Sequence, residues 1–313
     1  MRADFSTFPD EADSSPRVTL HDTRVIGIVE EPVSFSLKSV QAEAVKIALA
    51  QLNPTVGAVR SNSDLVVDAV QVAAAAGAEL VITSELFISG YPPKDLLLRE
   101  GFVSACEAAV ADIATRLPPG IALLLGHPAC KALPTDHLTN AVSLLRDGRV
   151  SQTIHKQLLP NYDVFDEQRY FRAGESVECL EHLGLSLGVH VCEDAWWSAP
   201  ETDHGSSTAR LVDPVSALAE QGADVLINLS ASPFELDKPG RRISLFERHA
   251  TGHKIPFLFI NQVGGNDDLV FDGNSLVLGR DGHPVLQLAS FRPDIQVVDL
   301  QDLPATVPAL ERP

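Results

Sequence analysis

From residue 45 onward, short apolar runs alternate with longer amphipathic stretches, and this alternation restricts the chain to a layered α/β fold. Short apolar runs are typical of buried strands, whereas longer stretches with apolar residues three or four positions apart are typical of helices. Strands are predicted at 45–52, 78–86, 121–129, 185–192, 223–232 and 255–263, and helices at 62–78, 94–117, 213–222 and 241–254. Asn62 or Ser63 is the expected N-cap of the first helix, and Gly101 is expected to interrupt the second.

Two Asp-Gly pairs add hairpins to this pattern. Asp147-Gly148 lies between two strand-like runs in 141–156, and Asp281-Gly282 lies within 268–289. An Asp-Gly pair between apolar runs is typical of a tight turn that joins antiparallel strands. Strand–helix alternation favours parallel pairing, so the two signals together predict an α/β layered domain with a mixed sheet.

Composition narrows the class of protein. The formal net charge of −18 argues against a nucleic-acid or anionic-membrane partner, and no apolar run reaches the ~18 residues that a membrane span needs. The first ~44 residues mix acidic residues, Ser and Pro, so 1–44 is predicted to be a partly disordered N-terminal extension without a signal-peptide core. The four cysteines form neither a CxxC pattern nor a disulfide framework, and the histidines lack metal-ligand spacing. We therefore expect a cytoplasmic protein with reduced thiols, no metal and no cofactor.

Three candidate catalytic residues each follow a strand-like run. These are Glu85, Lys156 and Cys192. Catalytic groups in strand–helix folds gather at the carboxyl ends of strands, where the loops converge. A thiol can attack an amide carbon, a carboxylate can take the thiol proton and pass it to the leaving ammonia, and an ammonium can stabilise the oxyanion. The set therefore predicts a thiol amide hydrolase.

Each of these residues also has an ordinary interpretation. A lone cysteine at the end of an apolar strand is commonly a small buried hydrophobe, and a glutamate or lysine there is commonly solvated. A papain-like pair of Cys192 with His190 is a second interpretation. These two residues would share a strand face, where neighbours rarely meet in the required geometry, and no orienting Asn or Asp is evident.

The segments around the three residues resemble one family. TSELFISGYPPKDLL, HKQLLPNYDVFDEQRYF and VCEDAWW resemble the three signature segments of the nitrilase (carbon–nitrogen hydrolase) superfamily. With NQVGGNDDLVFDGNS, they are similar more narrowly to the glutaminase domain of glutamine-dependent NAD+ synthetase. The resemblance implies a four-layer α-β-β-α sandwich over 45–290, with 291–313 as a C-terminal tail. It also implies pairing of subunits, so a homo-oligomer is expected by analogy.

The resemblance assigns roles to the catalytic residues. It implies that Glu85 is the general base, Lys156 the oxyanion stabiliser and Cys192 the nucleophile. Glu167 matches a second glutamate that holds the lysine and the base in place.

It also assigns substrate-binding roles. Tyr162, Glu193, Ser230 and Ser232 match positions associated with the glutamine pocket. Arg241 or Arg242 is a candidate for the substrate carboxylate, with a solvated helix start as the ordinary interpretation.

The resemblance implies the glutaminase part of a glutamine-dependent NAD+ synthetase system, with L-glutamine as substrate. No SGGxDS-type or GxxxxGK[ST] loop occurs, so no ATP-dependent synthetase domain is expected in this chain. A separate ammonia-dependent NAD+ synthetase subunit is the partner this suggests, and a truncated chain is another explanation. Two further interpretations remain open: a free-standing amidase for another small amide, a carbamoyl compound or a nitrile, and a non-catalytic scaffold subunit.

Overall fold

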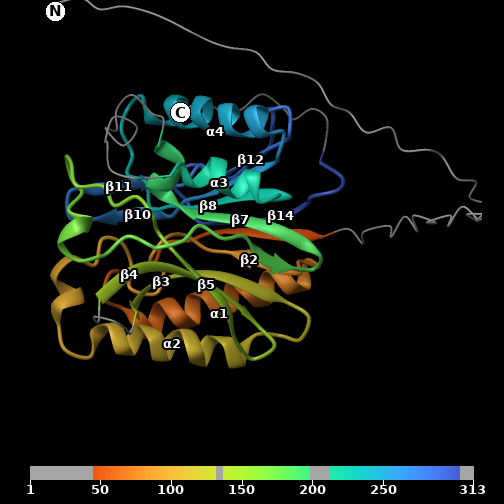
Figure 1. Ribbon diagram of the computed structural model, residues 1–313. Coiled ribbons are helices and arrows are strands. Elements are labelled where there is room, and N and C mark those ends of the chain that lie inside the picture. Colours follow the sequence, from red (N-terminus) through yellow and green to blue (C-terminus); the bar gives the residue numbers. More distant parts are fainter. Residues whose placement is uncertain (1–44, 132–136, 198–211, 304–313) are drawn as a thin grey trace, which may run out of the picture. The chain divides into compact units, whose positions relative to one another are not determined.

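The computed structural model describes residues 45–131, 137–197 and 212–303. The expected N-terminal extension, 1–44, lies outside these residues. The first of two six-stranded sheets has the order β14-β1-β2-β3-β4-β5 (Figure 1). Its strands are β1 (Lys46–Gln51), β2 (Leu80–Ile82), β3 (Ala122–Lys131), β4 (His137–Arg146), β5 (Arg149–His155) and β14 (Asp294–Asp299).

The second sheet has the order β13-β12-β9-β8-β7-β6, and β10 pairs with β11 in a separate ribbon. Its strands are β6 (Leu180–His182), β7 (Leu185–Val191), β8 (Val225–Leu229), β9 (Phe257–Ile260), β12 (Leu276–Leu278) and β13 (Pro284–Gln287). The ribbon consists of β10 (Val263–Asn266) and β11 (Leu269–Asp272).

Helices cover the outer face of each sheet (Figure 1). The α-helices are α1 (Val59–Ala75), α2 (Phe102–Arg116), α3 (Pro214–Glu220) and α4 (Lys238–His253). The short 3₁₀ helices in the described part of the chain are η1 (Lys94–Leu98), η2 (Glu167–Arg169) and η3 (Cys192–Trp196). One apolar core lies between the two sheets, a second between α1, α2 and the first sheet, and a third between α3, α4 and the second sheet. The four-layer α-β-β-α prediction is confirmed.

Both sheets are mixed, as predicted. In the first sheet β1, β2 and β3 are parallel, while β4 and β5 follow as antiparallel hairpin neighbours. Two reversals return β5 to the direction of β3, so the carboxyl ends of β2 and β5 lie at the same edge. In the second sheet β7, β8 and β9 are parallel and likewise end together. This topology brings segments that are distant in sequence to one site.

Some element boundaries differ from the sequence prediction. α1 begins at Val59, so Asn62 and Ser63 both lie inside the helix and the predicted N-cap is wrong. The Asn62 side chain binds the backbone of Thr55 and Ile88, and the Ser63 hydroxyl donates to Val59 O. The interruption at Gly101 is confirmed, because this glycine has a φ of +78° between η1 and α2. Part of the expected tail, 291–313, belongs to the first sheet, since β14 pairs antiparallel with β1.

Candidate active site

Lys156 lies at the centre of a buried charge cluster. The residue directly follows β5, and its Nζ lies 2.7 Å from Glu85 Oε1. The same Nζ lies 2.9 Å from each carboxylate oxygen of Glu167. Lys156 and Glu85 side chains are fully shielded from solvent, and that of Glu167 is 6% exposed. An ammonium carries three donors, so two carboxylate partners leave one N–H for another acceptor.

The Glu85 carboxylate is held from both sides. Asn140 Nδ2 donates to Oε1 at 2.7 Å, from β4, which β3 separates from β2 in the sheet. The Ala231 N–H donates to Oε2 at 3.0 Å, from the segment that follows β8. Glu85 itself lies in the loop that follows β2. The ammonium of Lys156 is the third donor to its carboxylate, and the three donors together fix the orientation of that carboxylate. Fixed orientation is what a general base requires.

Electrostatics favours a charged lysine despite its burial. Burial alone disfavours the ammonium of Lys156, but Glu167 and Glu85 outweigh this effect and hold its pKa well above the usual range. Burial raises the pKa of Glu167 to about 7, against the lowering effect of Lys156. Tyr91 donates its hydroxyl to Glu167 Oε1 at 3.0 Å and so fixes this second carboxylate.

Cys192 stands at a sharp turn between strand and helix. It follows β7 directly, starts η3 and has a φ of +45°, a conformation that L-residues adopt only at a cost. Burial raises the pKa of its thiol well above the usual range, and the charge of Glu85 raises it further. The resting sulfur is therefore a neutral thiol that needs a base, and Glu85 is close enough to act on it electrostatically.

Asp194 ties the cysteine turn to the lysine loop. Its Oδ1 accepts the N–H groups of Gln157 at 3.0 Å and Leu158 at 2.8 Å, directly after Lys156. Its Oδ2 accepts the N–H of Val191 at 2.9 Å, directly before Cys192. Asp194 is only 1% exposed, so these hydrogen bonds are shielded from solvent.

A cavity of about 160 Å³ opens beside the cysteine. Its lining residues are Tyr162, Asp163, Phe165, Cys192, Glu193, Trp196, Ser232, Glu235, Lys238 and Arg241. The Tyr162 hydroxyl donates to Glu193 Oε1 at 2.8 Å. Glu235 binds Lys238 at 3.1 Å and Arg241 at 2.9 Å. The cavity lining thus contains three carboxylates, one phenol, two cations and one thiol.

The comparisons with known proteins identify the family of the chain. The model of the carbon-nitrogen hydrolase family matches residues 46–306. This chain belongs to that family, within the nitrilase superfamily. A glutamine-dependent NAD(+) synthetase from Synechocystis is 40% identical over 256 residues, which cover 80% of this chain and 45% of that protein. Its counterpart from Rhodobacter capsulatus is 39% identical, with 82% and 43% covered. The hydrolase thus spans a little under half the length of these curated relatives.

Solved structures confirm the nitrilase-type fold. The glutamine-dependent NAD+ synthetase from Acinetobacter baumannii superimposes with a TM-score of 0.75 at 32% identity, covering 86% of this chain and 49% of that one. An amidase of the nitrilase superfamily from Nesterenkonia AN1 superimposes with a TM-score of 0.69 at 28% identity. That similarity covers 83% of this chain and 92% of the amidase.

The hydrolase brings most of the predicted site residues together. Glu85, Lys156 and Glu167 are in contact, and Cys192 lines the cavity with Tyr162, Glu193 and Ser232. The remaining predicted residue is placed differently, because the Ser230 hydroxyl donates to Asn228 Oδ1 at 2.6 Å and Ser230 is not among the cavity-lining residues. Of the two arginine candidates, Arg241 lines the cavity, whereas Arg242 is buried in an ion pair with Asp272.

The Cys-His interpretation is not supported. His190 Nδ1 lies 3.1 Å from Gly188 O, and the imidazole packs edge-on against Phe257 in the core beneath the helices of the second sheet. Cys192 instead belongs to the core between the two sheets. Burial lowers the pKa of His190 to about 3, so the ring is neutral and remote from base chemistry.

The site residues that sequence reasoning missed include Tyr91, Asn140, Asp194, Glu235 and Lys238. Tyr91 and Asp194 lie within the signature segments, where neighbours of the catalytic residues could have been flagged. Asn140 sits in an apolar run and Lys238 in a charged stretch, and neither has a local signal. Asn140 reaches Glu85 because β4 pairs with β3, and Lys238 reaches the cavity from the first residue of α4.

Among the described residues, no group of three or more His, Cys, Asp and Glu side chains could hold a metal ion. In the same part of the chain, no helix is both long and apolar enough to cross a bilayer.

Proposed function

We propose that this hydrolase converts L-glutamine to glutamate and ammonia through a thioester on Cys192. The cavity beside the cysteine carries this proposal. An amino-acid head group needs an anion for its ammonium and a cation for its carboxylate. Glu193 with Tyr162 supplies the first, and Lys238 with Arg241 supplies the second, in the same cavity as the thiol.

The first half-reaction forms the thioester. The Cys192 thiol gives its proton to Glu85 while its sulfur attacks the side-chain carbonyl carbon of glutamine. The oxygen of that carbonyl becomes an oxyanion, and the third N–H of Lys156 supports it. The intermediate then collapses, and the leaving nitrogen takes the proton from Glu85 and departs as ammonia.

The second half-reaction releases glutamate. A water molecule gives a proton to Glu85 and adds to the thioester carbonyl, and Lys156 again supports the oxyanion. Collapse breaks the carbon–sulfur bond, and the proton returns from Glu85 to the Cys192 sulfur. Glu167 keeps Lys156 charged and in place throughout.

We further propose that ammonia is passed to a separate ammonia-dependent NAD+ synthetase subunit. This rests on the similarity to the first part of two NAD(+) synthetases, each a little over twice the length that is matched. The second candidate is a free-standing amidase for another small amide or a carbamoyl compound. The Nesterenkonia amidase favours it, because the similarity covers 92% of that whole chain.

The deciding experiment measures ammonia release from L-glutamine by the purified chain, beside a Cys192→Ala variant. Cys130→Ala is the matched control, because Cys130 is also a cysteine outside any disulfide but is exposed. We expect release from the wild type and the control, with none from Cys192→Ala. Equal release from Cys192→Ala would refute the mechanism.

Two additions separate the candidates. Stimulation of release by an added ammonia-dependent NAD+ synthetase would support the partner proposal. Turnover of acetamide or a carbamoyl compound without turnover of glutamine would establish the second candidate instead. No turnover of any amide, in a chain that is folded by circular dichroism, would favour the scaffold interpretation.

A further inference from the structure

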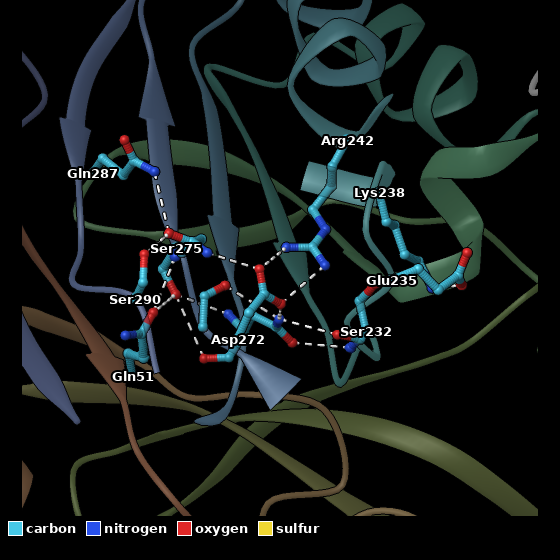
Figure 2. A network of polar contacts seen from close by, with 12 residues as sticks. Gln51, Ser232, Glu235, Lys238, Arg242, Asp272, Ser275, Gln287 and Ser290 are labelled. Atoms are coloured by element: carbon cyan, nitrogen blue, oxygen red, sulfur yellow. Dashed lines mark hydrogen bonds and ion pairs between the residues drawn. The ribbon is translucent and has the colours of Figure 1, made fainter. Parts of the chain in front are cut away.

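A second buried polar network lies next to the site but outside the catalytic cavity. We call Arg242, Asn261 and Asp272 the Asp272 network. Figure 2 shows Arg242 reaching down to Asp272, with Ser232 beside them. All three network residues are buried, and none lines the cavity beside Cys192. An effect of the network on the catalytic residues is therefore transmitted through other residues.

The ion pair at its centre is well formed. The guanidinium of Arg242, on α4, donates to both oxygens of Asp272 at 3.1 Å, and Asn274 Nδ2 donates to Asp272 Oδ2 at 2.8 Å. The side chains of Arg242 and Asp272 are 4% and 0% exposed. A buried ion pair adds little net stability compared with apolar packing. The contribution we consider for this pair is therefore to fix the positions of the side chains that it contacts.

Asn261 connects this pair to the backbone beside the site. Its Oδ1 accepts the Ser232 N–H at 2.9 Å, and its Nδ2 donates to Ser232 O at 3.2 Å. The same Nδ2 donates to Gly273 O at 3.2 Å and lies 3.5 Å from Asp272 Oδ1. Turning the amide over would break every one of these contacts, so its orientation is fixed.

The segment that Asn261 binds, residues 230–232, also binds Glu85, the proposed general base. Ala231 precedes Ser232 and donates its N–H to Glu85 Oε2, while Glu85 N donates to Ser230 O at 3.4 Å. We propose that Asn261, backed by Asp272, is a positioning residue that fixes Glu85 through the segment 230–232. The proposal rests on the function proposed above, in which Glu85 takes the thiol proton.

The test compares Asn261→Ala with Asn274→Ala. Asn274 is the matched control, because it is a buried asparagine that contacts Asp272 but not Ser232. General-base catalysis contributes about 10²- to 10⁴-fold, so partial misplacement of the base should lower kcat by about tenfold to hundredfold. We expect this loss in Asn261→Ala with KM changed less than about threefold. Asn274→Ala should keep kcat within about twofold.

Thermal unfolding of both variants separates positioning from stability. A kcat loss that is equal in the two variants and follows their loss of melting temperature would overturn the proposal, as would an unchanged kcat in Asn261→Ala. Asp272→Asn serves as a milder second variant if Asn261→Ala does not fold. We expect it to lower kcat in the same direction, and a wild-type kcat there would also count against the proposal.

A measurement that needs no amide substrate separates the role of Asn261 from the proposed function. Alkylation of Cys192 by iodoacetamide requires loss of the thiol proton but no amide substrate. We expect slower alkylation in Asn261→Ala, as in Glu85→Gln, and a wild-type rate in Asn274→Ala. If no amide is turned over by the wild type, the proposed function fails, while the alkylation rates still decide the role of Asn261.

Discussion

Substitution of Asp194 by Asn tests the tie between the nucleophile and the lysine loop. The carboxylate accepts three backbone N–H groups, two at Oδ1 and one at Oδ2. An asparagine can keep the two bonds at Oδ1 as neutral ones, at a loss of about 1 kcal/mol each. Its amide then faces the Val191 N–H donor to donor, and an unpaired buried N–H costs about 1–3 kcal/mol. The turn before Cys192 should therefore shift.

The pH dependence of this penalty follows from the pKa of Asp194. Burial raises that pKa from 3.8 to about 7, against the lowering effect of the N–H donors. A raised folded-state pKa means that the folded protein binds the proton more tightly, so this group stabilises the fold at low pH and that contribution is lost as pH rises towards 7. One unit corresponds to about 1.36 kcal/mol, so the Asp194→Asn penalty should be about 2 kcal/mol larger at pH 5.5 than at pH 8.

The assay is urea unfolding of wild type and Asp194→Asn at both pH values, with ammonia release from glutamine measured in parallel. We expect turnover to fall by at least about tenfold, because an error of about 1 Å in catalytic geometry can cost about 10²-fold. Val191 and the residues after Lys156 would then no longer share an anchor. A penalty that grows with pH, or full turnover in the variant, would refute this account of Asp194.

Two further predictions concern the cavity and the thiol. Tyr162→Phe removes a hydrogen bond to Glu193 that contributes about 0.5–1.5 kcal/mol. KM for glutamine should therefore rise about two- to tenfold with little change in kcat. A loss of kcat alone would instead mean a catalytic role for Tyr162. The raised pKa of Cys192 predicts that its alkylation rate has no inflection near pH 8.5, where free cysteines ionise, and mass spectrometry of the alkylated peptide tests this; an inflection at or below that pH would contradict a neutral resting thiol.

Local patterns in the sequence predicted the mixed sheets and the positions of Glu85, Lys156 and Cys192 at strand ends, whereas the four-layer arrangement followed from the family resemblance. Glu85 and Cys192 end apolar runs that become parallel strands, and Lys156 follows a strand that a predicted Asp-Gly turn brings back to the same edge. The direction of each strand, and hence the common edge, follows from the alternation of helices and hairpins. Residues at strand ends are therefore the part of a site that a single sequence can predict.

Residues that act across elements could not be predicted in this way. Asn140 reaches Glu85 from the middle of β4, and Lys238 enters the cavity from the start of α4. Ser230 differs in the other direction: it lies in a segment that resembles the family's substrate-binding segment, but its hydroxyl donates to Asn228 and it does not line the cavity. The face to which a side chain points at the end of a strand depends on the partner strand, and no local pattern records that partner.

The charges of the site are consistent with the proposed mechanism, in which Glu85 is the base and Cys192 the nucleophile. Glu85 and Glu167 surround the single cation of Lys156, so the buried cluster already carries more negative than positive charge when both are ionised. A resting thiolate at Cys192 would add a further buried anion, which is consistent with the raised pKa of its thiol. Proton transfer to Glu85 during attack avoids this state, because negative charge moves from the carboxylate to the substrate oxygen. Lys156 contacts Glu85 at the start and is free to donate to that oxygen as the charge moves.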